Sequence, residues 1–290
     1  MIVTNVRRLR DPFVLVEDDA YYMYGSEWKL YKNTSGRLDG EWVRVNKQIV
    51  VDPEDFAGEY RWAPEVYKYN GAYYMFTTYL SLETGQRGCA TFKSDSPEGP
   101  FVEISDGHFT RGDMYCIDAS LYIDEEGQPW VVYVDEHATK PDRIGCMSVA
   151  KMNKELTKII SEPKEIFRAD SPSFPILNVT DGCYLYRTKK GSLLMIWSNY
   201  QSITEYAVLV ARSDNGKMDG NWIQDDKPLF TKEINGGTFD GGHGMIFTDH
   251  DGQMYMSIHS PNFYRRDVKR WETPVLIKIK EENDNLVLEL

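Results

Sequence analysis

The fold of this chain is decided by the stretch Arg10-Asp11-Pro12-Phe13, which leads into Val14-Leu15-Val16-Glu17-Asp18-Asp19-Ala20-Tyr21-Tyr22-Met23-Tyr24-Gly25. An aspartate stands at a proline-fixed turn just before an apolar strand. A short polar turn then leads to a second strand, which is rich in tyrosine and long apolar residues. The stretch therefore predicts a β-hairpin that begins with an ionisable side chain.

The same unit returns four more times along the 290 residues. The later copies begin at Ala63, Asp118, Asp181 and His243, and most of them contain a turn with glycine before their second strand. Such hairpin turns need or tolerate a positive φ. Counted from Asp11, the starts are roughly 50 to 60 residues apart, which is the spacing of propeller blades.

A second recurrent phrase follows the hairpin and predicts two further strands. It consists of an apolar run, a polar turn and an aromatic residue, and it is clearest in residues 30–42, 90–101 and 208–222. The copy at residues 147–159 is weaker, and the proline-containing residues 161–175 after it predict a long loop between two repeats.

The sequence therefore predicts an all-β fold: a five-bladed β-propeller with four-stranded antiparallel blades around a central channel. No linker or change in composition interrupts it, so residues 1–290 are expected to form a single domain. A β-sandwich or a pair of barrels is the alternative, but neither of these folds requires the same phrases to recur.

Composition limits the partners. The net charge of −12 argues against nucleic acid and against an anionic membrane, because both bind basic patches. No apolar run is long enough to cross a bilayer, and residues 1–8 lack the apolar core of a signal peptide. We expect a cytoplasmic protein, or a secreted or periplasmic one whose leader was removed. The oligomeric state stays open.

The four cysteines do not have the spacing of a zinc site. They are Cys89, Cys116, Cys146 and Cys183, and each lies in or beside a strand-like run. We expect them to be small buried residues in a reducing compartment.

In a propeller, the first strand of each blade lines the channel, so the residues that lead these strands should converge. Four of the five are ionisable: Asp11, Asp118, Asp181 and His243. Burying them together costs desolvation and repulsion, which indicates a function. Paired carboxylates are the equipment of glycoside hydrolysis, in which one activates water and the other protonates the leaving oxygen. Candidate sugar-stacking rings lie near these starts or later in the blades: Phe13, Trp62, Tyr115, Tyr184 and Trp197.

The motifs at these starts resemble those of glycoside hydrolase family 43. They are Arg10-Asp11-Pro12, Trp62-Ala63-Pro64-Glu65-Val66, Ile117-Asp118-Ala119-Ser120 and Gly241-Gly242-His243-Gly244-Met245-Ile246-Phe247. Each motif is weak alone, but their order and spacing along nearly the whole chain are specific. The resemblance implies a five-bladed propeller that acts as an O-glycosyl hydrolase with inversion, chiefly as an α-L-arabinofuranosidase, arabinanase or β-xylosidase.

The resemblance also implies residue roles. Asp11 matches the general base, and Asp118 matches the carboxylate that raises the pKa of the acid and orients it. The family's acid is a Glu followed by Gly and Pro, whereas this chain has Asp181-Gly182-Cys183. Asp181 is therefore the expected acid, with a carboxylate one methylene shorter. Glu205 and Glu136 are the alternatives, and loss of catalysis is a third.

The resemblance further implies a calcium or other hydrated ion in the channel, faced by His243. Imidazole is a poor calcium ligand, so we expect water between them. The chemistry itself requires no cofactor. The family often places an arginine of the last blade near the substrate, and Arg265 and Arg266 are the candidates.

We therefore expect an exo-acting, inverting glycosidase that cleaves arabinosyl or xylosyl linkages of plant polysaccharides or their oligosaccharides. Many xylosidases of the family carry a C-terminal β-sandwich, whereas this sequence ends at Leu290 soon after the fifth repeat, which favours an arabinofuranosidase. Two alternatives stay open. One is a carbohydrate-binding propeller without turnover. The other is a related five-bladed glycosidase or phosphorylase, whose phosphate would need a cationic cluster. The scattered candidates for that cluster are Arg61, Arg111 and Arg187.

Overall fold

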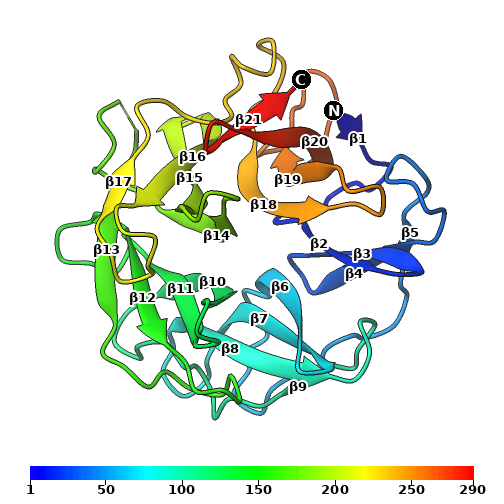
Figure 1. Cartoon of the computed structure of the whole chain (residues 1–290). Helices are drawn as coiled ribbons and strands as arrows, with labels where there is room; N and C mark the ends of the chain where they lie inside the picture. Colours follow the sequence, from blue (N-terminus) through cyan, green and yellow to red (C-terminus); the bar gives the residue numbers. More distant parts are fainter. Residues whose placement is uncertain (175) are drawn as a thin grey trace.

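The recurrent units fold into five antiparallel β-sheets arranged in a ring (Figure 1). The computed structural model describes residues 1–174 and 176–290. The first blade contains β2 (Phe13–Glu17), β3 (Ala20–Gly25), β4 (Lys29–Asn33) and β5 (Val43–Arg44). The second contains β6 (Trp62–Tyr69), β7 (Ala72–Leu80), β8 (Arg87–Ser94) and β9 (Val102–Glu103). The third contains β10 (Cys116–Ile123), β11 (Pro129–Asp135), β12 (Cys146–Lys151) and β13 (Lys164–Arg168).

The fourth blade contains β14 (Asp181–Arg187), β15 (Leu193–Ser202), β16 (Glu205–Ser213) and β17 (Trp222–Gln224). The fifth contains β18 (Gly242–Thr248), β19 (Met254–Ser260) and β20 (Thr273–Glu282), with β1 (Ile2–Val3) and β21 (Asn285–Glu289) both paired to β20. The predicted all-β, five-bladed propeller is therefore confirmed. Because β1 comes from the start of the chain, it closes the ring by completing the last blade.

The innermost strands of the five blades contact one another around the axis. These strands are β2, β6, β10, β14 and β18. Four clusters of buried apolar side chains fill the space within and between the blades. Burial of this apolar surface stabilises the ring.

The aromatic residue of the second phrase has the same role in two blades. Trp42 and Trp222 are both buried, and each indole N–H donates to the carbonyl four residues earlier, that of Leu38 or Met218, at 3.1 Å. This shared contact supports the reading of blades one and four as copies of one unit.

The expectation of a long loop over residues 161–175 is wrong in part, because β13 (Lys164–Arg168) lies within it. Strand β13 is an edge strand with an exposed Lys-Glu pair at its start, so it lacks the apolar run that marks the other strands. Pro175 lies outside the described residues.

All four cysteines are free and buried, as the sequence predicts. None of the described segments is a helix of the length and apolarity needed to cross a membrane.

Candidate active site

Each blade has one residue with positive φ at the start of its inner strand or just before it. The five residues are Asp11 (φ 55°), Ala63 (42°), Asp118 (57°), Gly182 (35°) and His243 (53°). The pairing of β6, β10, β14 and β18 with their neighbours shifts register at this point. Aspartate and histidine tolerate this conformation better than most residues, but alanine adopts it rarely, so five such positions together are a strained feature of the kind found at functional sites.

The five positive-φ residues show that Asp181 does not occupy the blade-start position that the sequence repeat assigns to it. Gly182, and not Asp181, is equivalent to Asp11 and Asp118. A Cβ atom on Gly182 would lie 2.6 Å from the ring of His243, so only glycine fits there. The residues directly before these five positions are Arg10, Trp62, Ile117, Asp181 and Gly242.

A pocket of about 660 Å³ lies over these two rows of residues. Its lining brings together Asp11, Asp118, Asp181 and His243, the four ionisable side chains that the sequence expects to converge. A second pocket, of about 410 Å³, is lined by the later residues of the inner strands and is more apolar. The polar site therefore lies at the starts of the inner strands.

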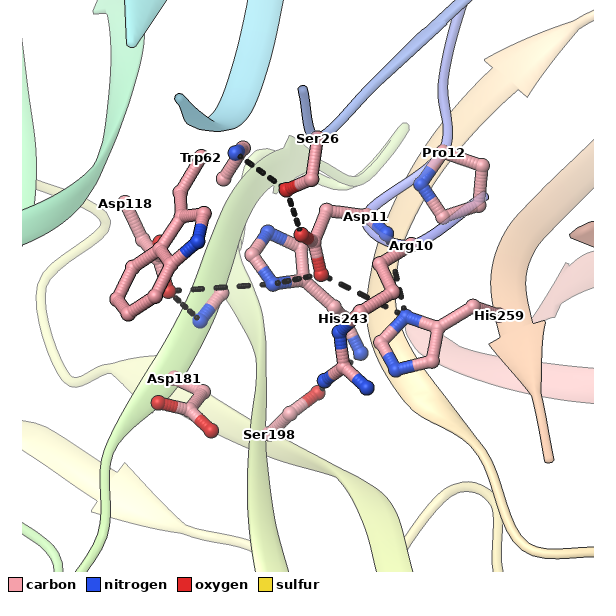
Figure 2. Close-up of polar contacts among 12 residues, drawn as sticks. Arg10, Asp11, Pro12, Ser26, Trp62, Asp118, Asp181, Ser198, His243 and His259 are labelled. Carbon is pink, nitrogen blue, oxygen red and sulfur yellow. Dashed lines mark hydrogen bonds and ion pairs between the residues drawn. The ribbon is translucent and has the colours of Figure 1, made fainter. Parts of the chain in front are cut away.

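Asp11 has hydrogen-bond donors on several sides (Figure 2). The Ser26 hydroxyl donates to Oδ2, and Nδ1 of His243 lies 3.2 Å from Oδ1. Burial alone would raise the pKa of Asp11, but His243 and Arg10, together with the Ser26 hydrogen bond, lower it to about 2. Asp11 is therefore an ionised carboxylate at neutral pH.

His259 contacts Asp11 as a neutral side chain. Burial lowers the pKa of His259 to about 3. Its Nδ1 accepts the backbone N–H of Asp11 at 3.2 Å, and Nε2 lies 3.0 Å from Oδ1 of Asn262. A nitrogen that accepts an amide proton carries none of its own, so His259 orients Asp11 and does not supply charge.

Asp118 is also buried, but its charge has partners. The Gly182 N–H donates to Oδ2 at 2.9 Å, and Nδ1 of His243 lies 3.9 Å from the same oxygen (Figure 2). Burial raises the pKa of Asp118, and these two neighbours oppose that effect.

Asp181 has the opposite environment to Asp11. Burial and then the Asp118 carboxylate raise its pKa well above the usual range. Its hydrogen bond comes from the Tyr206 hydroxyl, 3.1 Å from Oδ2. Of the two coupled carboxyls, Asp181 is the one that keeps a proton, because Asp118 has a backbone amide and an imidazole to stabilise its charge.

The two alternative acids are less suited to the role. Glu136 lines the pocket, but it forms a 2.8 Å ion pair with Arg87. Glu205 lies outside the pocket lining and pairs with Lys232 at 3.5 Å.

The predicted aromatic contacts divide into two groups. Trp62 lines the pocket, whereas Tyr115 does not, and the ring of Tyr115 lies 4.2 Å from the guanidinium of Arg87. Phe13 and Trp197 do not face the pocket. Phe13 is buried against Tyr67 and lines the second pocket, and Trp197 is 0% exposed. Placing these two against substrate was wrong, because alternation along a strand does not say which face meets the channel.

The predicted arginines also lie elsewhere. Arg265 pairs with Asp267, Arg266 is exposed, and neither lines the pocket. The three arginines that were candidates for a phosphate-binding cluster do not line the pocket either: Arg61, Arg111 and Arg187. Arg10 lines the pocket instead, with Nη2 donating to Oδ1 of Asn262 at 2.9 Å. Its position directly before Asp11 was the signal that could have identified it.

The donors present do not fit a protein-ligated calcium ion. Nδ1 of His243 faces two carboxylates, and calcium takes six to eight oxygens. Among residues 1–174 and 176–290, no group of three or more His, Cys, Asp or Glu side chains is placed to hold a metal. A hydrated ion near His243 stays a prediction.

Comparison with known proteins gives one family. Residues 3–284 match the model of the Glycosyl hydrolases family 43. The solved structure of an endo-arabinase from Bacteroides thetaiotaomicron is 31% identical, with 98% of each chain covered and a TM-score of 0.84.

Two further matches are more distant or shorter. An endo-1,4-beta-xylanase structure from the same organism is 24% identical, covers 100% of this chain and 97% of its own, and has a TM-score of 0.80; it shows the fold alone. A probable arabinan endo-1,5-alpha-L-arabinosidase B of Aspergillus fumigatus is 29% identical over 143 residues, which are 43% of this chain and 37% of that relative. The chain thus matches little more than a third of that relative's length.

Proposed function

The chain belongs to glycosyl hydrolase family 43, and from this premise we propose that it is an inverting glycosidase that cleaves α-L-arabinofuranosyl linkages in arabinan or its oligosaccharides. One observation carries the proposal: two half-buried carboxyls, Asp11 and Asp181, line one pocket in opposite electrostatic environments. Two carboxyls whose pKa values are pushed apart are the mark of an acid and a base.

The reaction follows from those environments. Ionised Asp11 takes a proton from a water molecule whose oxygen attacks the anomeric carbon. Asp181 gives its proton to the glycosidic oxygen as the bond from that oxygen to the carbon breaks. The products are a sugar of inverted configuration and a free hydroxyl on the departing unit. Asp118 disfavours ionisation of Asp181 until its proton is needed.

The choice of arabinose over xylose rests on likeness. The endo-arabinase match covers nearly all of both chains at 31% identity. The xylanase match falls below the identity at which more than fold can be argued.

The test is hydrolysis of linear arabinan, debranched arabinan oligosaccharides and β-1,4-xylan, with products resolved by chromatography and anomeric configuration followed by NMR. We expect arabinan to be cleaved, with the inverted anomer appearing first. Release of arabinose alone indicates attack at chain ends, whereas early release of longer fragments indicates internal attack. Turnover of xylan alone would replace the substrate in the proposal. Binding of arabinan without turnover would overturn the enzyme assignment.

A further inference from the structure

Asp181 is joined to one side chain from its own blade. Figure 2 shows it apart from the group of contacts around Asp11, without a dashed line to the other residues drawn. Its partner is Tyr206 on β16, whose hydroxyl donates to Oδ2 at 3.1 Å. Sequence reasoning did not identify this tyrosine, because it lies 25 residues after Asp181 and outside every blade-start motif.

The ring of Tyr206 is buried and closely packed. The residue is 2% exposed, with Tyr200 packed against it at 4.7 Å and His259 stacked at 5.7 Å between ring centroids. A Cβ atom on Gly242 would lie 2.5 Å from the ring, so the glycine leaves room for it.

The backbone beneath the ring is also anchored. The Tyr206 N–H donates to Oδ2 of Asp240 at 3.0 Å, and the other oxygen of Asp240 accepts the Asn262 N–H at 3.3 Å. The phenol hydroxyl is therefore fixed in one place. It can act as a preorganised donor, which costs no reorganisation during the reaction.

A donor at Oδ2 has a chemical consequence. A protonated carboxyl carries its proton on one oxygen only. Because Oδ2 already accepts the Tyr206 O–H, protonation of Oδ2 is less favourable than protonation of Oδ1. The proton is directed to Oδ1. When Asp181 gives it up, the phenol O–H stabilises the negative charge that develops.

We infer that Tyr206 is a positioning residue for the acid: it fixes which oxygen of Asp181 carries the proton and stabilises the carboxylate left after transfer. The inference rests on the proposed role of Asp181. It also explains how a carboxyl one methylene shorter than the expected glutamate is held in place.

Several groups besides Tyr206 act on the charge of Asp181. They come from the segments before β2 and after β11 and from β10, and they are Arg10, Glu136 and Asp118. A Tyr206→Phe variant leaves all of them in place, so a change in its pH profile reports the lost hydroxyl.

The test is Tyr206→Phe beside Tyr200→Phe. Tyr200 is the matched control, because it lies in the same wall but its hydroxyl accepts from Asn262. Both enzymes would be assayed from pH 4 to 10 on 4-nitrophenyl and methyl glycosides of one arabinosyl chain. The methyl glycoside needs full proton donation, and the nitrophenyl glycoside needs little.

For Tyr206→Phe we expect kcat on the methyl glycoside to fall about tenfold or more, with a clearly smaller fall on the nitrophenyl glycoside. The alkaline limb of the pH–activity profile should move to higher pH, because the variant lacks a hydrogen bond that favours the ionised form of Asp181. Tyr200→Phe should leave that limb in place. Circular dichroism and thermal melting check that both variants fold.

Equal losses on the two glycosides, with an unmoved alkaline limb, would overturn the inference and leave Tyr206 as a packing residue. That outcome differs from failure of the proposed function, which would appear as wild-type enzyme that cleaves neither glycoside. If Tyr206→Phe fails to fold, Tyr206→Leu, which also lacks the hydroxyl and is smaller than tyrosine, is assayed under the same criteria.

Discussion

The starts of blades one and four each place an aspartate at the same pocket, but the two side chains have opposite surroundings. Asp11 meets Ser26, His243 and Arg10, which lower its pKa to about 2. For Asp181, burial and then the neighbouring Asp118 carboxylate raise the pKa well above the usual range. The difference shows that the groups around each carboxyl, from its own blade and from other blades, decide its protonation.

The offset of one residue explains how the two surroundings arise. Asp11 occupies the positive-φ position just before β2, next to the histidines of blade five. Asp181 precedes the bulge of its own strand, and Gly182 takes the bulge position. That glycine leaves space for His243, whose Nδ1 faces Asp11 and Asp118.

The largest effect is expected for Asp11→Asn, which removes the ionised member of the pair of carboxyls. The amide keeps the shape but cannot take a proton, so we expect turnover to fall by about 10²- to 10⁴-fold or more. Isothermal titration with an arabinan oligosaccharide should still show binding. A variant that retains wild-type turnover would remove Asp11 from the role of base.

Asp181→Asn should give the next largest loss, and it should depend on the leaving group. We expect a fall of about 10²- to 10⁴-fold on oligosaccharides and a much smaller fall on a 4-nitrophenyl glycoside, because nitrophenolate leaves with little protonation. Glu205→Gln is the control, since its carboxylate lies outside the pocket lining. If Asp181→Asn works as well as wild type, the acid lies elsewhere, and Glu136 is the next candidate.

A smaller effect is expected for Asp118→Asn, which removes a carboxylate that helps to keep Asp181 protonated. Burial and then Asp118 raise the pKa of Asp181, so Asp118→Asn should lower that pKa. The acid must be protonated to work, and activity is lost as pH rises through its pKa. The alkaline limb of kcat/KM should therefore move to lower pH. The acid limb, set by Asp11 with a pKa of about 2, should remain below the assay range. An alkaline limb that stays in place would show that Asp118 does not set the pKa of Asp181.

The fold was predictable because its signals are local and repeated. Five hairpins with period-two apolar strands give the blades, and a single copy would have been ambiguous. The closing strand β1 (Ile2–Val3) was not predictable, because its two residues carry no pattern and pair with β20 across the whole length of the chain.

The site was predictable where chemistry stands at a repeat start, as for Asp11, Asp118, Asp181 and His243. It was not predictable where a role depends on packing between distant segments. Tyr206 reaches Asp181 from the third strand of the blade, and Arg10 is held by Asn262, 252 residues away. Trp197 shows the converse error: it lies in the blade that supplies Asp181, yet the core encloses it.

The smallest expected effect concerns the glycine that separates the two aspartates' environments. Gly182→Ala places a methyl group 2.6 Å from the His243 ring at a φ of 35°. Gly127→Ala is the matched control, because Gly127 has a φ of 75° but nothing within 4 Å of the added atom. Both variants carry the cost of left-handed backbone, about 1 kcal/mol, and Gly182→Ala should lose about 1 to 3 kcal/mol more through the clash.

Urea unfolding measures that difference in the free energy of unfolding. His243 must shift to admit the methyl group, and Nδ1 of that ring faces Asp11 at 3.2 Å. Gly182→Ala should therefore also lose turnover, while Gly127→Ala keeps it, because Gly127 lies in a turn away from the pocket. Equal stability and equal activity of the two variants would mean that His243 moves freely, and the bulge array would then not hold the base and the acid in separate environments.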